Sequence, residues 1–320
     1  IQWHLTHACE LHCKHCYDRT KLAAMKLSQA IDVLDQLVPF CREREVRGAV
    51  CLTGGNPFLY RHFFEVYQAA FERGLRVAIY GNPVSAEELD RLVAIGKPGY
   101  FQVSLEGLEE HNDAIRGEGY FRRVLSFLPM LSERGIPPVV MATLTEANVD
   151  ELIPLARVLR GKVNRFAFNR LSAVGEGAGL RGVEDKERYG RFMIDWMVEA
   201  QRDPALYCKD NLFNVFRHEL GQPLYGGCTG VGCGAAFNFV ALLPNLEVHA
   251  CRKFPSRIGS LTEASLAEVY DSELAMRYRR GCSACDGCAI RHRCGGCLAV
   301  SHGSGLDPFT ERDPQCFMHD

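Results

Sequence analysis

The sequence lacks any long hydrophobic run. No uninterrupted apolar stretch approaches the ~20 residues that a membrane-spanning helix needs, and no secretory signal is visible. We therefore expect no membrane partner. The chain begins with Ile and not Met, so we expect it to be a processed or excised piece of a longer protein.

The sequence also lacks an excess of charge of one sign. It has 37 Lys and Arg residues against 39 Asp and Glu residues, which gives a net charge of −2. A protein that binds nucleic acid usually carries a basic face, so we expect no nucleic-acid partner. The length of 320 residues suits one large domain, or a large and a small one, and 47 % hydrophobic residues suffice for a sizeable core.

Cysteine, by contrast, is abundant. The chain has 15 cysteines, an odd number, so a complete set of disulfides would leave one unpaired. Most of them lie between Cys228 and Cys316, several in tight Cys-x-x-Cys groups. In a large chain, such groups indicate metal binding more than disulfides. We expect a cytoplasmic protein in a reducing or anaerobic cell.

The first half of the chain alternates two hydrophobic patterns. Short runs rich in Val, Ile and aromatic residues predict strands at 1–7, 48–55, 75–82, 99–107, 137–145 and 163–171. Amphipathic stretches predict helices at 28–43, 63–74, 85–96, 120–135 and 148–161. Ser28 and Ser85 are the expected N-caps of two of them, and internal prolines predict kinks or early ends in the last two.

Six strand–helix units imply parallel strands with right-handed crossovers. This leaves an open doubly wound sheet or a full or partial barrel. Chemistry in a barrel collects where its strands end, and Cys9, Gly54, Ser104 and the pair Asn169–Arg170 all stand at such ends. The pattern therefore favours a barrel.

Beyond the sixth strand the composition changes. Residues 172–183 are Gly-rich and predict a loop, which a helix over 184–201 follows. Residues 237–251 predict a hairpin that turns at Pro244–Asn245. We expect two domains, 1–205 and 206–320, the second thick with cysteine.

The segment CELHCKHCYD, residues 9–18, contains three cysteines and no obvious fourth ligand. A structural zinc site normally has four protein ligands, so His12 or His15 would have to join the cysteines. A disulfide with one spare Cys is a further alternative. The third is a [4Fe–4S] cluster held by three thiolates, whose fourth iron stays open for a small molecule.

A C-x3-C-x2-C loop after a barrel's first strand resembles the signature of the radical S-adenosylmethionine (SAM) enzymes, including a ring-bearing residue, His15, before the last Cys. The resemblance implies that Cys9, Cys13 and Cys16 hold a [4Fe–4S] cluster. It also implies that SAM chelates the open iron through its amino and carboxylate groups.

The stretch TGGNP (53–57) resembles the family's Gly-Gly-Glu-Pro stretch, which meets the SAM amino group. Gly54 and Gly55 would let the backbone approach SAM, with Pro57 after them. Asn56 replaces the usual Glu, which removes a charge. The alternative is an ordinary turn.

Two further stretches match the family's order. In VSLEG (103–107), the resemblance places Ser104 toward the SAM ribose, with Glu106 beside it. In HNDAIRG (111–117), it places Arg116 toward the SAM carboxylate, which the guanidinium fork matches. The alternative for Arg116 is a solvated cation at a helix end.

The C-terminal cysteines resemble the SPASM extension of radical SAM enzymes that modify peptides and proteins. The fold that this implies is α/β: a partial (β/α)6 TIM-like barrel with a cysteine-rich SPASM extension. The extension commonly holds two auxiliary [4Fe–4S] clusters, making three clusters in all. The family pattern assigns one to Cys228, Cys233, Cys251 and Cys297, and the other to Cys285, Cys288, Cys294 and Cys316. Cys282 is surplus, and structural zinc ribbons are the alternative.

The resemblance implies an enzyme that cleaves SAM reductively to a 5′-deoxyadenosyl radical, which abstracts hydrogen from a ribosomally made precursor peptide. Oxidative maturation follows, for example a thioether crosslink as in the sactisynthases. The PQQ-precursor maturases are similar, and an anaerobic sulfatase-type protein maturase is the alternative. A non-catalytic iron–sulfur electron-transfer protein is an alternative of another class. Expected partners are an electron donor such as flavodoxin or ferredoxin and a leader-peptide-recognition domain or protein. The sequence names no catalytic acid or base.

Overall fold

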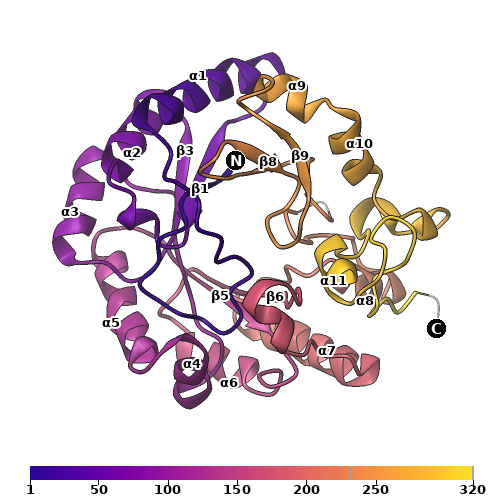
Figure 1. The fold of residues 1–320 in the computed structure, drawn as a ribbon. Helices are drawn as coiled ribbons and strands as arrows, with labels where there is room; N and C mark the ends of the chain where they lie inside the picture. The colour runs from indigo at the N-terminus through magenta and orange to yellow at the C-terminus, as the bar shows by residue number, and fades with distance from the viewer. Residues whose placement is uncertain (231, 319–320) are drawn as a thin grey trace.

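The fold is built around one curved sheet of nine strands (Figure 1). The computed structural model describes residues 1–230 and 232–318. The first six strands pair in parallel with their chain neighbours: β1 Gln2–Thr6, β2 Ala49–Gly54, β3 Arg76–Tyr80, β4 Phe101–Ser104, β5 Pro138–Leu144 and β6 Arg165–Arg170. The sheet order is β6-β5-β4-β3-β2-β1-β7-β8-β9, with β6 at one edge and β9 at the other. The expected α/β partial barrel is confirmed.

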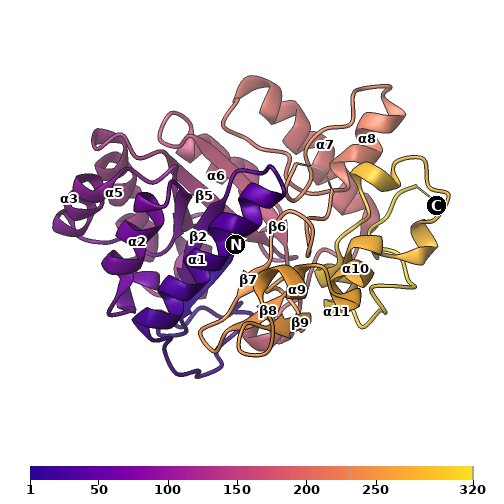
Figure 2. The same ribbon diagram turned by 90° about the horizontal axis from the view of Figure 1, so that it is seen from above.

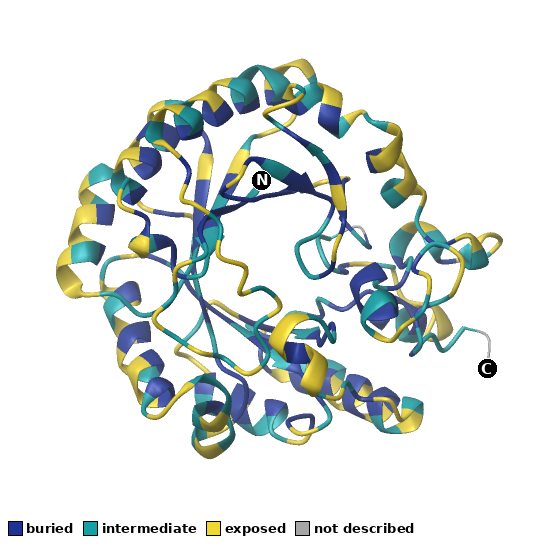
Figure 3. Ribbon diagram, in the orientation of Figure 1, coloured by how far each residue is buried: buried dark blue, intermediate teal, exposed yellow. Residues whose placement is uncertain are grey.

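Helices cover the outside of this sheet (Figure 1). The helices between the parallel strands are α1 Leu27–Glu43, α2 Phe63–Glu72, α3 Ala86–Ile95, α4 Glu109–Arg116, α5 Tyr120–Glu133 and α6 Leu152–Leu159. Their apolar residues recur every three or four positions, as Val33, Leu37 and Cys41 do in α1, and form one buried face against the strands. Figure 3 shows that the buried positions of these helices face the sheet and that the exposed positions face solvent. In the part of the chain that the structure describes, no helix is long and apolar enough to cross a membrane.

The helix ends test the expected caps and breaks. Ser85 caps α3 as predicted, because its Oγ accepts a bond from Glu88 N at 3.2 Å. The prediction for Ser28 was wrong: α1 begins at Leu27, and the Gln29 side chain accepts a bond from Lys26 N at 3.0 Å. The prediction for α5 was a kink or an early end at its proline; the helix continues past Pro129 to Glu133, so it has no early end there, and the kink stays a prediction.

The C-terminal part continues the same sheet. It begins with α7 Lys186–Arg202 and α8 Phe213–Glu219, followed by β7 Ala241–Leu242, β8 Glu247–His249 and β9 Arg257–Ser260. Strand β7 pairs in parallel with β1, and β7 and β8 form the predicted hairpin across Pro244–Asn245. The C-terminal helices that follow are α9 Leu266–Tyr270, α10 Glu273–Arg280 and α11 Leu298–Gly303. Short 3₁₀ turns occur along the chain at η1 Pro57–Leu59, η2 Gly175–Gly179, η3 Ser283–Cys285 and η4 Arg291–Arg293. Figure 2 shows α8, α10 and α11 on the side of the molecule opposite α2, α3 and α5. The domain boundary at 205 stays a prediction.

Candidate active site and cysteine clusters

The loop after β1 brings Cys9, Cys13 and Cys16 together. Cys16 N donates to Cys13 O at 3.1 Å, which closes the loop into a turn. The Cys13 thiol interacts electrostatically with both of the other thiols. Burial raises the pKa of the Cys9 and Cys13 thiols. The three half-buried thiols therefore lie in one loop at the end of β1. That they hold a cluster stays a prediction.

The two glycines after β2 lie directly against the chain that leaves β1. Gly55 N donates to Thr6 O, and Asn56 N donates to Ala8 O, each at 2.8 Å. A Cβ on Gly54 would lie 2.1 Å from Thr6 O, and one on Gly55 would lie 2.2 Å from Ala8 O. Neither position has space for a side chain, so the glycines set the approach of the two loops.

Asn56 and Pro57 form the turn that follows. Pro57 opens the 3₁₀ turn η1, and the Asn56 side chain caps it by accepting a bond from Phe58 N at 3.3 Å. Both residues are buried. These residues do form a turn, as the alternative interpretation expected. The turn is also bonded to the chain just before the cysteine loop, through Asn56 N and Ala8 O.

A buried ion pair stands beside the cysteine loop. Arg116 at the end of α4 donates through Nε to Glu106 Oε1 at 2.9 Å, and its Nη1 lies 3.7 Å from Cys13 Sγ. His15 Nε2 lies 3.3 Å from Glu106 Oε1. The pKa of Glu106 is well below its usual range, because the attraction of Arg116 and His15 outweighs the effect of burial. Arg116 is therefore no solvated cation.

Ser104 is a further residue that the sequence predicted for the SAM site. It ends β4, two residues before Glu106, and it is half-buried. Its position at the carboxyl end of the strand puts it on the same edge of the sheet as Gly54.

Sequence reasoning missed two polar residues at this edge. Asn82, which follows β3, donates through Nδ2 to Glu10 Oε1 at 2.8 Å, and the same nitrogen lies 3.8 Å from Cys9 Sγ. Glu10 is also bonded by Asn56 Nδ2. Asn82 was detectable as the polar last residue of the strand predicted at 75–82, and Glu10 as a carboxylate inside the cysteine motif.

The first C-terminal set of cysteines lines one cavity. Cys228, Cys233, Cys251 and Cys297 all border it. Burial, with the other thiols of the set, raises the pKa of Cys251 to about 12 and that of Cys233 well above its usual value. Residues from distant parts of the sequence thus meet as the family pattern expects.

The second set lies toward the C-terminus. The Cys285 thiol interacts electrostatically with Cys282, Cys288 and Cys316, and Cys294 interacts with Cys316. Burial raises the pKa of Cys285 and of Cys294 to about 12. Cys282, which the pattern left surplus, is buried beside this set, and its Sγ donates to Glu311 O at 3.1 Å.

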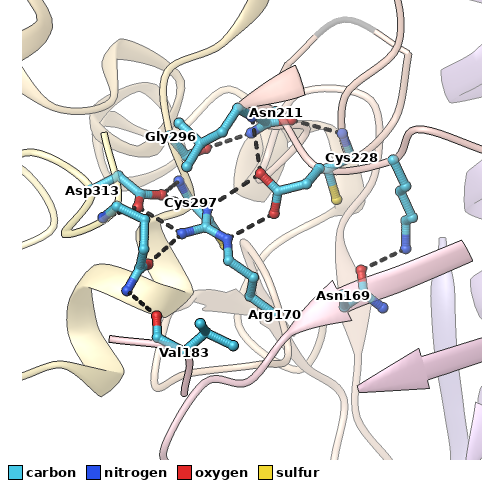
Figure 4. Close-up of polar contacts among 12 residues, drawn as sticks. Asn169, Arg170, Val183, Asn211, Cys228, Gly296, Cys297 and Asp313 are labelled. Carbon is cyan, nitrogen blue, oxygen red and sulfur yellow. Dashed lines mark hydrogen bonds and ion pairs between the residues drawn. The ribbon is translucent and has the colours of Figure 1, made fainter. Parts of the chain in front are cut away.

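Arg170 joins the barrel to the C-terminal part, and Figure 4 shows its guanidinium beside Asp313 and Cys297. It ends β6 and is buried. Its guanidinium donates to Asp210 at 2.8 Å and to both carboxylate oxygens of Asp313 at 2.6 Å. Asp313 also accepts a bond from Cys297 N at 2.8 Å, and its own carbonyl accepts one from Cys316 N at 2.9 Å. Arg170 is thus fully paired and has a structural role.

Two cations face the cavity of the first set. Lys209 and Lys253 both line it. Lys209 Nζ donates to Asn169 Oδ1 at 2.8 Å, the contact drawn in Figure 4, and burial lowers its pKa. Lys253 Nζ lies 3.4 Å from the carbonyl of Arg170. The charge of Lys253 works against the rise in the pKa of the Cys251 and Cys297 thiols, although burial outweighs it.

A second ion pair links the first cysteine loop to the C-terminal part. Asp18, two residues after Cys16, pairs with Arg252, the residue after Cys251. Both side chains are largely buried, with 7 % and 13 % of their surface exposed. The pKa of Asp18 is lowered, since bonds from Thr20 and the charge of Arg252 outweigh burial.

The cysteine sets fit iron–sulfur clusters by the chemistry of their donors. Neutral thiols interact only weakly with one another, so their grouping adds little stability by itself. As thiolates, the same side chains are the ligands of iron–sulfur clusters. In residues 1–230 and 232–318, no three His, Cys, Asp or Glu side chains are arranged to hold a single metal ion. A four-iron cluster binds its cysteines at separate corners and needs wider spacing.

Comparisons with known proteins agree on one family. The model of the Radical SAM superfamily matches residues 3–159. The mycofactocin maturase MftC of Mycolicibacterium smegmatis is 30% identical over 334 residues, which cover 99% of this chain and 82% of the relative. The AdoMet-dependent heme synthase of Methanosarcina barkeri is 24% identical over 99% of this chain and 95% of its own.

Solved structures share the fold. The structure of SuiB from Streptococcus suis bound to S-adenosylmethionine has a TM-score of 0.71 and 20% identity, and the match covers 98% of this chain and 76% of that chain. SuiB bound to its precursor peptide SuiA matches with the same TM-score of 0.71 and 18% identity, over 98% of this chain and 75% of that one. At these identities the likeness concerns the fold.

Proposed function

Because the chain belongs to the radical SAM superfamily and is an enzyme, we propose that it oxidatively modifies a ribosomally made peptide. The observation that carries the proposal is the 30% identity with the mycofactocin maturase MftC, over 99% of this chain. The fold shared with SuiB, which has been solved with a precursor peptide, supports it.

The residues at the carboxyl edge of the sheet form the proposed SAM site. Cys9, Cys13 and Cys16 would hold a [4Fe–4S] cluster, and the cluster with SAM supplies a 5′-deoxyadenosyl radical. The residues proposed to bind SAM are Gly54, Gly55, Asn56, Pro57, Ser104, Glu106 and Arg116. Their backbone and side chains orient the ligand and exclude water from the place where the radical forms.

The pair Glu106–Arg116 holds the cysteine loop in one orientation. Arg116 contacts Cys13 Sγ, and Glu106 is fixed in turn by Thr143 N, which donates to Oε2 at 2.6 Å. A buried charge with fixed partners keeps its position when a ligand arrives. We propose that this pair sets the geometry of the site and does not itself transfer a proton.

The two C-terminal cysteine sets would hold auxiliary [4Fe–4S] clusters. A hydrogen abstraction followed by ring closure leaves one electron to remove, and a cluster near the pocket is a ready acceptor. We propose a flavodoxin or ferredoxin as electron donor, a leader-peptide-recognition domain or protein as a further partner, and the cytoplasm as the location.

The test of this function is SAM cleavage coupled to peptide modification. The protein is reconstituted anaerobically with iron and sulfide and incubated with SAM, a reductant and candidate precursor peptides encoded near its gene. Formation of 5′-deoxyadenosine together with a peptide that has lost hydrogen supports the proposal. Absence of SAM cleavage in fully loaded protein contradicts it.

A tetrapyrrole is the second candidate substrate. The heme synthase relative matches 99% of this chain, and an Fe-coproporphyrin III synthase from the same organism is 27% identical over 63% of it. The same assay with Fe-coproporphyrin III in place of the peptide separates the two. Conversion of the porphyrin, with no change in any peptide, would favour this candidate.

A further inference from the structure

Glu10 places a carboxylate next to the proposed SAM site. It directly follows Cys9 in the cysteine loop, and Asn56 Nδ2 lies 3.1 Å from each of its two carboxylate oxygens. Asn82 Nδ2 donates to Oε1 at 2.8 Å. The carboxylate is therefore held by two amides from the ends of two different strands.

Both amides are fixed as donors toward Glu10. The oxygen of Asn56 accepts a bond from Phe58 N at 3.3 Å, and the oxygen of Asn82 accepts one from Tyr120 Oη at 3.2 Å. Because each oxygen is already engaged, the NH₂ group of each amide must face the carboxylate. Asn56 and Asn82 are both buried, whereas Glu10 as a residue is exposed.

Glu10 forms no ion pair among residues 1–230 and 232–318. In the part of the chain that the structure describes, its side-chain partners are the two neutral amides. Each oxygen of a carboxylate has two lone pairs, so a carboxylate held by two amide groups can still accept further hydrogen bonds. Such a group, exposed to a ligand and next to a cluster cysteine, is suited to receive a cation.

We propose that Glu10 receives the α-ammonium group of SAM in this enzyme. The family motif carries its carboxylate on the residue that here is Asn56, and Asn56 instead bonds Glu10, so the charge reaches the same place from the neighbouring loop. The inference depends on the proposed use of SAM. With Asn56 in place of the family's Glu, the carboxylate that balances the ammonium charge of SAM would then come from Glu10.

The test measures SAM binding without turnover. Wild-type protein and the variants Glu10→Gln and Glu10→Asn/Asn56→Glu are reconstituted anaerobically and kept oxidised, and the Kd for SAM is measured by equilibrium dialysis. Glu10→Gln should weaken binding by about ten- to a hundredfold, as expected for the loss of a charged hydrogen bond. The double variant, which returns the carboxylate to position 56, should regain most of the affinity.

A ligand without the amino group identifies the contact. S-adenosylhomocysteine and its desamino counterpart are compared by displacement of SAM: wild type should prefer the amino form, and Glu10→Gln should lose that preference. Glu110→Gln, which neutralises an exposed carboxylate on α4, is the matched control and should bind as wild type does.

Three results would overturn the inference. Equal SAM affinity in Glu10→Gln and wild type, with equal iron content, removes any role of the charge. Loss of iron in Glu10→Gln would show that Glu10 holds the loop and does not contact SAM. Failure of the loaded wild type to bind SAM would refute the proposed function itself, and the inference with it.

Discussion

The Arg116 guanidinium lies between a carboxylate and a thiol, donating to Glu106 at 2.9 Å and approaching Cys13 Sγ to 3.7 Å. The two partners come from different loops, one after β4 and one after β1. A buried ion pair of this kind is costly to break because it leaves the remaining charge unpaired. The cysteine loop is thereby fixed to the barrel through a charge as well as through the backbone.

Replacing Cys13 by Ala should abolish the first cluster and leave the others. Three four-iron clusters imply about twelve irons per chain, so the iron content should fall by about a third, and SAM cleavage should be lost. Iron analysis after anaerobic reconstitution measures the first effect, and 5′-deoxyadenosine the second. The control is Cys41→Ala, in the buried face of α1, which should keep its iron. Near-stoichiometric zinc with little iron in the wild type would contradict the cluster assignment.

Replacing Gly55 by Ala should separate the first two loops. A Cβ there would lie 2.2 Å from Ala8 O, a backbone atom that cannot rotate away. We expect the protein to lose the first cluster and SAM binding while the far C-terminal sets keep their iron. Gly179→Ala is the matched control, since a Cβ at that position meets nothing within 4 Å. Normal iron in Gly55→Ala would mean that the loops tolerate displacement.

Replacing Asp313 by Asn should destabilise the junction between barrel and C-terminal part. Within the described part of the chain, the change leaves buried Arg170 with Asp210 as its one carboxylate partner, and it weakens the bond to Cys297 N. Loss of a buried partner suggests a cost of about 3 kcal/mol in the free energy of unfolding. Urea unfolding of the loaded protein without oxygen measures it. Asp35→Asn, which breaks an exposed pair with Arg73, should change stability little, and an equal effect of both would refute the argument.

Replacing Cys285 by Ala should uncouple SAM cleavage from product. If the second auxiliary cluster accepts the electron left after hydrogen abstraction, 5′-deoxyadenosine should still form while modified peptide disappears. Both compounds are counted in one reaction, and circular dichroism confirms that the variant is folded. A folded variant that still couples cleavage to product would exclude an obligatory redox role for that cluster.

Much of the fold was predictable because the chain's local patterns agree with it. All six parallel strands were expected within about three residues of their observed ends, since short apolar runs alternate with amphipathic helices. The pairing of β7 with β1 was not expected. It involves only Ala241 and Leu242 against Gln2 and Trp3, a contact too short to leave a pattern in the sequence.

The site was predictable where residue types recur at fixed spacing. The three cysteine groups were predicted from spacing and resemblance, and the structure places their members near one another. Their role as cluster ligands stays a prediction. The contacts of Glu10, Asn82 and Lys209 follow from tertiary packing between distant loops. A single Glu or Asn at a strand end has no local pattern that names its partner.

The ion pair between Asp18 and Arg252 has a consequence for how the protein is made. Its members are 234 residues apart in the chain. On the ribosome, Cys9, Cys13 and Cys16 therefore emerge long before the arginine that holds the end of their loop. If these cysteines hold the proposed cluster, we expect their loop to gain this anchor only after the C-terminal part has been made.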